Sequence, residues 1–274
     1  MWALLLLACA RPLWISLTDF AALCGLSVPG RDILVECVGT LSALAAGGWL
    51  MFLVRAHHSA LRIRIAALSA LALAGPAALL LTTELSGIIQ TLAATVMMTW
   101  LALEVVIHHG VTVQGFGLGP SSARREAGIT LPTTIYLVHY IAAWAATFIM
   151  TYLTRALPTA LPAMQGDQAV ALGWDTKALA ISNIIYTSAM EEVLIVGAVC
   201  VLSQAARRPV WQMYAISLGF RVITHLYLGL PALALSILGA VGLFLYHRWG
   251  RLQPLVLAHL LFDLRSVFPI ATIF

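Results

Sequence analysis

Apolar runs separated by short polar connections follow one another along the whole chain of 274 residues. A run of about 18 residues or more is a candidate transmembrane helix, because a helix rises about 1.5 Å per residue and the hydrocarbon core is about 30 Å thick. Only 9% of the residues are charged, against about 25% in soluble domains. The sequence therefore predicts an all-α fold, a polytopic transmembrane helix bundle, with runs at 3–28, 36–54, 65–83, 86–107, 132–154, 177–204, 210–229, 231–247 and 253–273.

Basic residues gather in alternate connections between these runs, at Arg55/Arg62/Arg64, Arg124/Arg125, Arg207/Arg208 and Arg248/Arg251. By the positive-inside rule these connections face the cytoplasm. Nine spans then fit, with the N-terminus inside and the C-terminus outside. The first run contains Arg11, Pro12 and Asp19, and a broken or interfacial helix there would leave eight spans. We expect a multi-pass protein of the cell membrane that contacts the lipid bilayer and binds no nucleic acid.

The longest basic connection divides the chain into two halves. Residues 1–109 form a predicted N-terminal four-helix half, and residues 110–131, rich in Gly and Ser, form a predicted flexible cytoplasmic linker. Residues 132–274 form a five-helix half, which we expect to hold the catalytic core.

Ionisable residues inside the apolar runs are the candidates for a functional site, since each costs about 2.5–3.5 kcal/mol at mid-membrane. Arg221 and His225 are four residues apart and therefore share a helix face. His259 and Asp263 are also four residues apart, which predicts an imidazole that is oriented by a carboxylate or shares a proton network with it. His139 has no polar neighbour at helical spacing, and we interpret it as a structural histidine. Most of the candidates lie in the C-terminal half: Glu191, Glu192, Arg221, His225, His259, Asp263 and Arg265.

The adjacent glutamates cannot serve the same purpose, because the side chains of Glu191 and Glu192 diverge by about 100° around a helix. Two carboxylates this close in a low dielectric are not both ionised unless a cation lies near them. Arg221 and Arg265 are the nearest candidates for that cation. We expect one glutamate to face the polar centre of the bundle while the other reaches a second neighbour.

A glutamate and two histidines on three helices suit hydrolysis, since a carboxylate can take a proton from water and imidazoles can donate to an oxyanion. The same residue types bind catalytic zinc, with Glu191, His225 and His259 as the ligands. The residues alone leave both possibilities open. We predict that these side chains meet around a water-accessible pocket within the membrane.

The glutamate pair also carries a resemblance to a known family. The stretch "EEVLIVG" resembles the first motif, Glu-Glu-x-x-x-Arg followed by Gly, of the CAAX-protease and bacteriocin-processing (CPBP, Abi) family, which includes the prenyl-protein endopeptidase Rce1. Glu191, Glu192 and Gly197 match this motif. Val196 stands where the family has its arginine.

Two further motifs extend the resemblance, which covers residues 110–270 and is clearest over 186–265. "RVITH" resembles Phe-x-x-x-His, with His225 in place and Arg221 where phenylalanine is usual. "HLLFD" resembles His-x-x-x-Asn/Asp, with His259 and Asp263 in place. Arg221 either replaces the charge that Val196 lacks, or the site has lost its activity.

The resemblance implies an intramembrane endopeptidase that cleaves a membrane-associated protein or peptide without a covalent intermediate. One glutamate and His225 would activate water, and His259 and Asp263 would line the oxyanion site. It implies no required cofactor, with zinc as the alternative. Two other functions remain open: a catalytically silent protein of this fold, acting in bacteriocin immunity or as a partner scaffold, and a proton-coupled transporter. No inverted repeat with a matching set of charges supports transport.

Overall fold

The computed structural model describes residues 1–55, 62, 64–67, 83–118, 130–156 and 174–267. Every regular element in these ranges is helical, which confirms the all-α prediction for this part of the chain. Nearly all of the predicted run at 65–83 and residues 119–129 of the predicted linker lie outside the described residues. The elements are α1 (Trp2–Leu23), α2 (Arg31–Arg55), α4 (Thr83–His108), α5 (Thr130–Ala156), α7 (Lys177–Ala189), the π-helix η3 (Met190–Ala198), α8 (Val199–Ala205), α9 (Val210–Ile223), the 3-10 helices η4 (Leu226–Leu228) and η5 (Leu230–Ala234), α10 (Leu235–Trp249) and α11 (Gln253–Val267).

Among the described residues, six helical segments are long and apolar enough to cross a bilayer: Trp2–Leu23, Arg31–Arg55, Leu85–His108, Thr130–Ala156, Lys177–Ala205 and Leu230–Trp249. The outer faces of the bundle expose large apolar side chains such as Phe52 and Phe148, as a lipid-facing surface does. The protein is therefore a multi-pass membrane protein. The count of eight or nine spans stays a prediction, because α9, with 14 residues, and the described part of α11, with 15, are shorter than a crossing requires.

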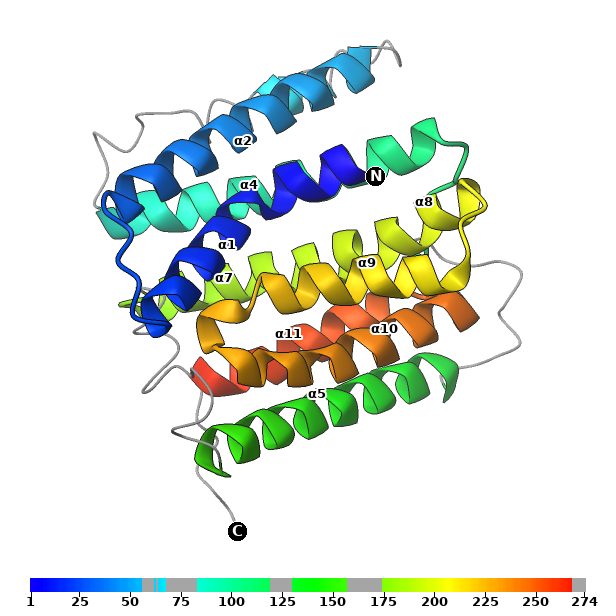
Figure 1. Ribbon diagram of the computed structural model, residues 1–274. Helices are drawn as coiled ribbons and strands as arrows, with labels where there is room; N and C mark the ends of the chain where they lie inside the picture. The colour runs from blue at the N-terminus through cyan, green and yellow to red at the C-terminus, as the bar shows by residue number, and fades with distance from the viewer. Residues whose placement is uncertain (56–61, 63, 68–82, 119–129, 157–173, 268–274) are drawn as a thin grey trace.

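The helices lie roughly side by side, in layers around the α7–η3–α8 segment (Figure 1). On one side of this segment α1 and α4 pack against it, and α2 lies outside them. On the other side lie α9, α10 and α11, with α5 outermost. The π-helix η3 contacts helices from both halves of the sequence, which places Glu191 and Glu192 at the centre of the bundle.

The C-terminal ends of α2, α8 and α10 lie at the same end of the bundle (Figure 1). Arg55 is the last residue of α2, Arg207 follows α8, and Arg248 lies in the last turn of α10. This common placement agrees with the alternating basic connections in the sequence. Which end faces the cytoplasm stays a prediction.

The first helix is continuous, so the possibility of a broken helix in this run was wrong. Pro12 lies inside α1 and has no N–H to donate to the carbonyl of Ala8. The hydroxyl of Tyr186 donates to that carbonyl instead, at 3.4 Å. The two charged residues of this helix are also paired, Arg11 with Glu36 at 3.1 Å and Asp19 with Arg31. These contacts satisfy the polar groups that the sequence pattern suggested would break the helix.

The beginning of the predicted linker is packed against the C-terminal half. Phe116 is fully buried, and its carbonyl accepts a hydrogen bond of 3.1 Å from the hydroxyl of Tyr246. Gly117 has φ +79°, and a Cβ there would lie 2.5 Å from the carbonyl oxygen of Gly250. Only glycine fits so close an approach. Phe116 and Gly117 are therefore packed against the C-terminal half, and the linker and the division into domains stay predictions.

Candidate active site

The adjacent glutamates lie in a stretch of π-helix within the apolar segment that runs from α7 to α8. The N–H of Val199 donates to the carbonyl of Leu194, five residues earlier, as π-helical pairing requires. All nine residues of η3 are buried. Such insertions are rare and occur frequently at functional sites, because they redirect side chains without ending the helix. Here the carboxylates of Glu191 and Glu192 both reach one side chain on α9.

That side chain is Arg221, which is 1% exposed and lies between the two carboxylates. Its Nη1 is 2.8 Å from Oε2 of Glu191, and its Nη2 is 2.8 Å from Oε1 of Glu192. A cation in this position allows both carboxylates to be ionised in a buried site. Gly239 on α10 provides the space for the Arg221 side chain, since a Cβ at Gly239 would lie 3.0 Å from Cδ of Arg221.

Arg265, the second cation that the sequence offered, does not lie between the glutamates. Its guanidinium carbon lies over the rings of Trp144, at 3.7 Å, and Phe262, at 4.0 Å. These are cation–π contacts on the side of the bundle where α5 and α11 meet. The expectation for Arg265 was therefore wrong.

Glu191 forms the first of two polar groupings, with His225. This histidine follows the end of α9, so it lies on an irregular turn and not on the helix itself. Its Nδ1 is 2.8 Å from the carbonyl oxygen of Arg221, to which it must donate. Nε2 is thereby left facing Oε1 of Glu191, at 3.3 Å. Both of these atoms are acceptors when unprotonated, so the contact is favourable when one proton lies between them.

The turn that carries His225 is held inside the protein. The backbone N–H of Tyr227 donates to the buried hydroxyl of Ser16 on α1, at 3.0 Å. Tyr227, Leu228 and Ala232 form a small buried cluster over η4 and η5. Irregular backbone within a membrane protein is tolerated where protein surrounds it, as here.

Glu192 forms the second grouping, with His259 and Asp263 on α11. Oε1 of Glu192 is 2.9 Å from Nδ1 of His259, and Nε2 of His259 is 3.3 Å from Oδ2 of Asp263. A neutral imidazole can donate to only one of these carboxylates, so both contacts are hydrogen bonds only when both nitrogens carry protons. The sequence prediction that His259 pairs with Asp263 is confirmed by this contact.

His139 on α5 also belongs to this second grouping, although the sequence indicated a lone structural histidine. Its side chain is fully buried, and Nε2 lies 3.5 Å from Oε1 of Glu192, which is too long for a good hydrogen bond. The rings of His139 and His259 meet edge to face at 6.3 Å. Gly242 on α10 provides the space for the His139 ring, since a Cβ at Gly242 would lie 3.0 Å from Cε1 of His139.

The structure brings together a different set of possible metal ligands from the one that the sequence suggested. Among the described residues, His139, Glu192 and His259 form a group whose ligand atoms lie within 4.8 Å of one another. His225 instead contacts Glu191, on the other side of Arg221. The proposed zinc set of Glu191, His225 and His259 is therefore not the group that the geometry favours.

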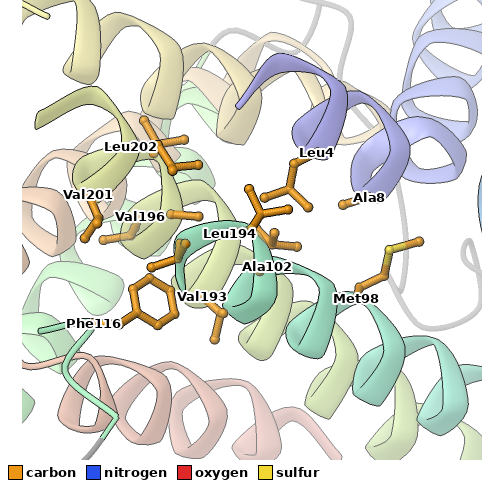
Figure 2. Packing of buried hydrophobic residues seen from close by; sticks show 14 of the residues in the cluster. Leu4, Ala8, Met98, Ala102, Phe116, Val193, Leu194, Val196, Val201 and Leu202 are labelled. Carbon is orange, nitrogen blue, oxygen red and sulfur yellow. The ribbon is translucent and has the colours of Figure 1, made fainter. Parts of the chain in front are cut away.

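Val196, at the position of the family's arginine, lies in the apolar core. It is fully buried beside Val193, Leu194 and Phe116 (Figure 2). The cation that contacts both glutamates is Arg221, on a different helix. The position of Arg221 is the one expected if it replaces the charge that Val196 lacks.

Most of the site is closed to the surroundings. Glu192 is fully buried, and Glu191 and His259 are 5% and 4% exposed. The side chains of His225 and Asp263, 15% and 30% exposed, are the members that reach furthest out. Water and substrate would therefore reach the site on the side of these two residues. The water-accessible pocket stays a prediction.

The fold and site define an all-helical multi-pass membrane protein with a buried glutamate–histidine centre. Residues 173–265, about a third of the chain, match the family model of the type II CAAX prenyl endopeptidases, Rce1-like. This match supports a CPBP/Rce1-like family assignment, and the matched segment contains every predicted site residue from Glu191 to Asp263. No curated protein and no solved structure gave a significant match.

Proposed function

We propose that the protein is an intramembrane endopeptidase of the CAAX-protease type, acting in the cell membrane on a membrane-associated protein or peptide. One observation carries the proposal. The adjacent glutamates of the matched segment each contact a histidine, Glu191 at 3.3 Å from His225 and Glu192 at 2.9 Å from His259. Buried carboxylate–imidazole pairs are costly in a membrane bundle, and water activation is a chemical reason to keep them.

The pair of Glu191 and His225 is suited to activating the attacking water. The hydrogen bond from Nδ1 of His225 to the carbonyl of Arg221 leaves Nε2 as the nitrogen that can exchange a proton. A water molecule bound beside Nε2 of His225 and the carboxylate of Glu191 gives up a proton to this pair as its oxygen attacks the peptide carbonyl carbon. The pair returns that proton to the amine nitrogen when the C–N bond breaks, so that no covalent intermediate is needed.

The second grouping is suited to holding the charges of the site. Arg221 fixes both carboxylates, and its buried guanidinium can stabilise negative charge that develops on a substrate bound beside it. His259 can donate to a substrate oxyanion only by giving up one of its two carboxylate contacts. Asp263, 30% exposed, is the partner that a substrate can displace, whereas Glu192 is enclosed.

The proposal is tested by comparing membranes from cells that produce the wild type with membranes from cells that produce Glu191→Gln. Mass spectrometry of protein termini should find new termini of membrane proteins, at or near their membrane segments, in the wild-type sample and not in the Glu191→Gln sample. The matched control is Glu36→Gln, a carboxylate with a 69% exposed side chain outside the site, which should give the wild-type set of termini. If all three samples contain the same termini, the protein is not the endopeptidase proposed, and a silent member of the family becomes the better account.

A further inference from the structure

We propose that Ser16 on α1 is a positioning residue that holds the imidazole of His225 against Glu191. Ser16 lies outside the matched segment 173–265 and outside all three sequence motifs. This role rests on the proposed function, in which Glu191 and His225 activate water. It makes the first helix of the chain a working part of a site whose other members all lie in the C-terminal half.

The turn that carries His225 depends on support from another helix. Since α9 ends before His225, the hydrogen bonds of that helix do not fix the residues that follow. The N–H groups of Leu228 and Gly229 donate to carbonyls within the turn, at 2.9 and 2.7 Å. The N–H of Tyr227 donates instead to Oγ of Ser16, at 3.0 Å and 211 residues away in the sequence. This hydrogen bond ties the turn to α1.

Tyr227 links Ser16 to the imidazole of His225 in two ways. Its backbone is close to that of His225 in the same turn, and its ring lies against the imidazole, with centroids 5.8 Å apart and planes inclined by 31°. Nε2 of His225 is 3.3 Å from Oε1 of Glu191, so any outward movement of the turn takes this contact beyond hydrogen-bond distance. A misplacement of about 1 Å in a catalytic site can lower the rate by about 10²-fold.

The helix that carries Ser16 is itself fixed against the matched segment. The hydroxyl of Tyr186 on α7 donates to the carbonyl of Ala8, at 3.4 Å, and the rings of Trp2 on α1 and Phe220 on α9 meet at 6.2 Å. Ser16 is fully buried, so water does not compete for its oxygen. Its Oγ is therefore a fixed acceptor on a rigid element, which is the kind of support that a precise site requires.

The test measures kcat and KM in lipid nanodiscs, at a temperature well below the melting point of every variant, with the membrane peptide identified from the terminus comparison. Ser16→Ala should lower kcat by about 10²-fold and leave KM close to the wild-type value. The matched control is Thr18→Val. Thr18 is also buried on α1, but its hydroxyl donates to carbonyls of its own helix, those of Trp14 and Ile15, so this variant should keep the wild-type kcat.

Two further measurements separate positioning from general stability. In the His225→Gln background, Ser16→Ala should lower kcat little further, because Ser16 acts through His225. Nitrogen NMR of protein labelled with ¹⁵N-histidine needs no substrate. The signal of His225, identified by its absence from His225→Gln, should report a proton on Nδ1 in the wild type and in Thr18→Val, and should shift or broaden in Ser16→Ala.

Three results would overturn the proposal: a Ser16→Ala variant that melts lower but keeps the wild-type kcat, an equal loss of kcat in the His225→Gln background, or an unchanged His225 signal. If Ser16→Ala is not recovered folded, Ser16→Cys takes its place, because it keeps the side-chain size and replaces the oxygen with a weak acceptor. If the wild type cleaves no peptide, the proposed function fails, and the His225 signal still decides whether Ser16 positions the imidazole.

Discussion

Replacing Arg221 with methionine should destabilise the protein strongly. Methionine has a similar length and no charge, so the two carboxylates that Arg221 joins would lose their cation. The guanidinium is 1% exposed and its partners are 6% and 0% exposed, so solvent cannot take over its role. Removing one partner of a buried ion pair costs about 3–5 kcal/mol. A loss of this size lowers the melting temperature by on the order of 10 °C in a chain of this length.

The assay is thermal denaturation in detergent, followed by size-exclusion chromatography of the protein that stays in solution. Arg11→Met is the matched control, because Arg11 forms an ion pair whose side chains are 51% and 69% exposed. Exposed pairs contribute about 0–1 kcal/mol, so this variant should melt close to the wild type. Adding Glu192→Gln to Arg221→Met should restore part of the lost stability, because it removes one unpaired buried charge. An Arg221→Met variant that melts with the wild type would refute the role of Arg221 as the shared cation.

Three further perturbations test parts of the structure around the site. Gly242→Ala should lower the free energy of unfolding by about 1–3 kcal/mol, because the new Cβ would lie 3.0 Å from Cε1 of His139. The control is Gly48→Ala, whose Cβ would have no atom within 4 Å, and this variant should melt at the wild-type temperature or above it. Ser16→Ala should lower the free energy of unfolding by about 1–3 kcal/mol, because the buried backbone N–H of Tyr227, in the turn after α9, would lose its acceptor. An unchanged melting temperature would mean that other contacts hold this turn. A cysteine at Arg207 should resist a membrane-impermeant thiol reagent added to intact cells, and efficient labelling would reverse the predicted topology.

Much of the central segment could be predicted from the sequence. The apolar run at 177–204 matches the continuous helical segment 177–205, because an unbroken apolar run of this length has few alternatives in a membrane. The convergence of Glu191 and Glu192 with Arg221, His225 and His259 also followed from the cost of burying such groups alone. The π-helix itself was not predictable, since its extra residue per turn is a matter of backbone pairing that side-chain pattern does not record.

The parts that the sequence missed depend on contacts between distant elements. His139 has no polar neighbour at helical spacing on α5, and its partners lie on η3 and α11. His139 did stand out in the sequence as an ionisable residue within an apolar run. Spacing within one helix could not identify its partners, because they lie on other helices. The run at 210–229 suggested one helix, whereas α9 ends at Ile223 and two 3-10 turns follow. Hydropathy does not record such a break, because the turn residues are as apolar as the helix.

We propose that Glu191 and His225 together activate water for peptide hydrolysis. It is tested most directly by the turnover of a membrane peptide, identified from the terminus comparison, by purified protein in lipid nanodiscs. Glu191→Gln and His225→Gln should each lower kcat by about 10²–10⁴ while remaining folded, and the double variant should lose little more than either one, because the two groups act as a unit. His247→Gln, on the exposed face of α10, should keep the wild-type rate. Turnover by either single variant within a few-fold of the wild type would contradict a role of Glu191 and His225 in activating water.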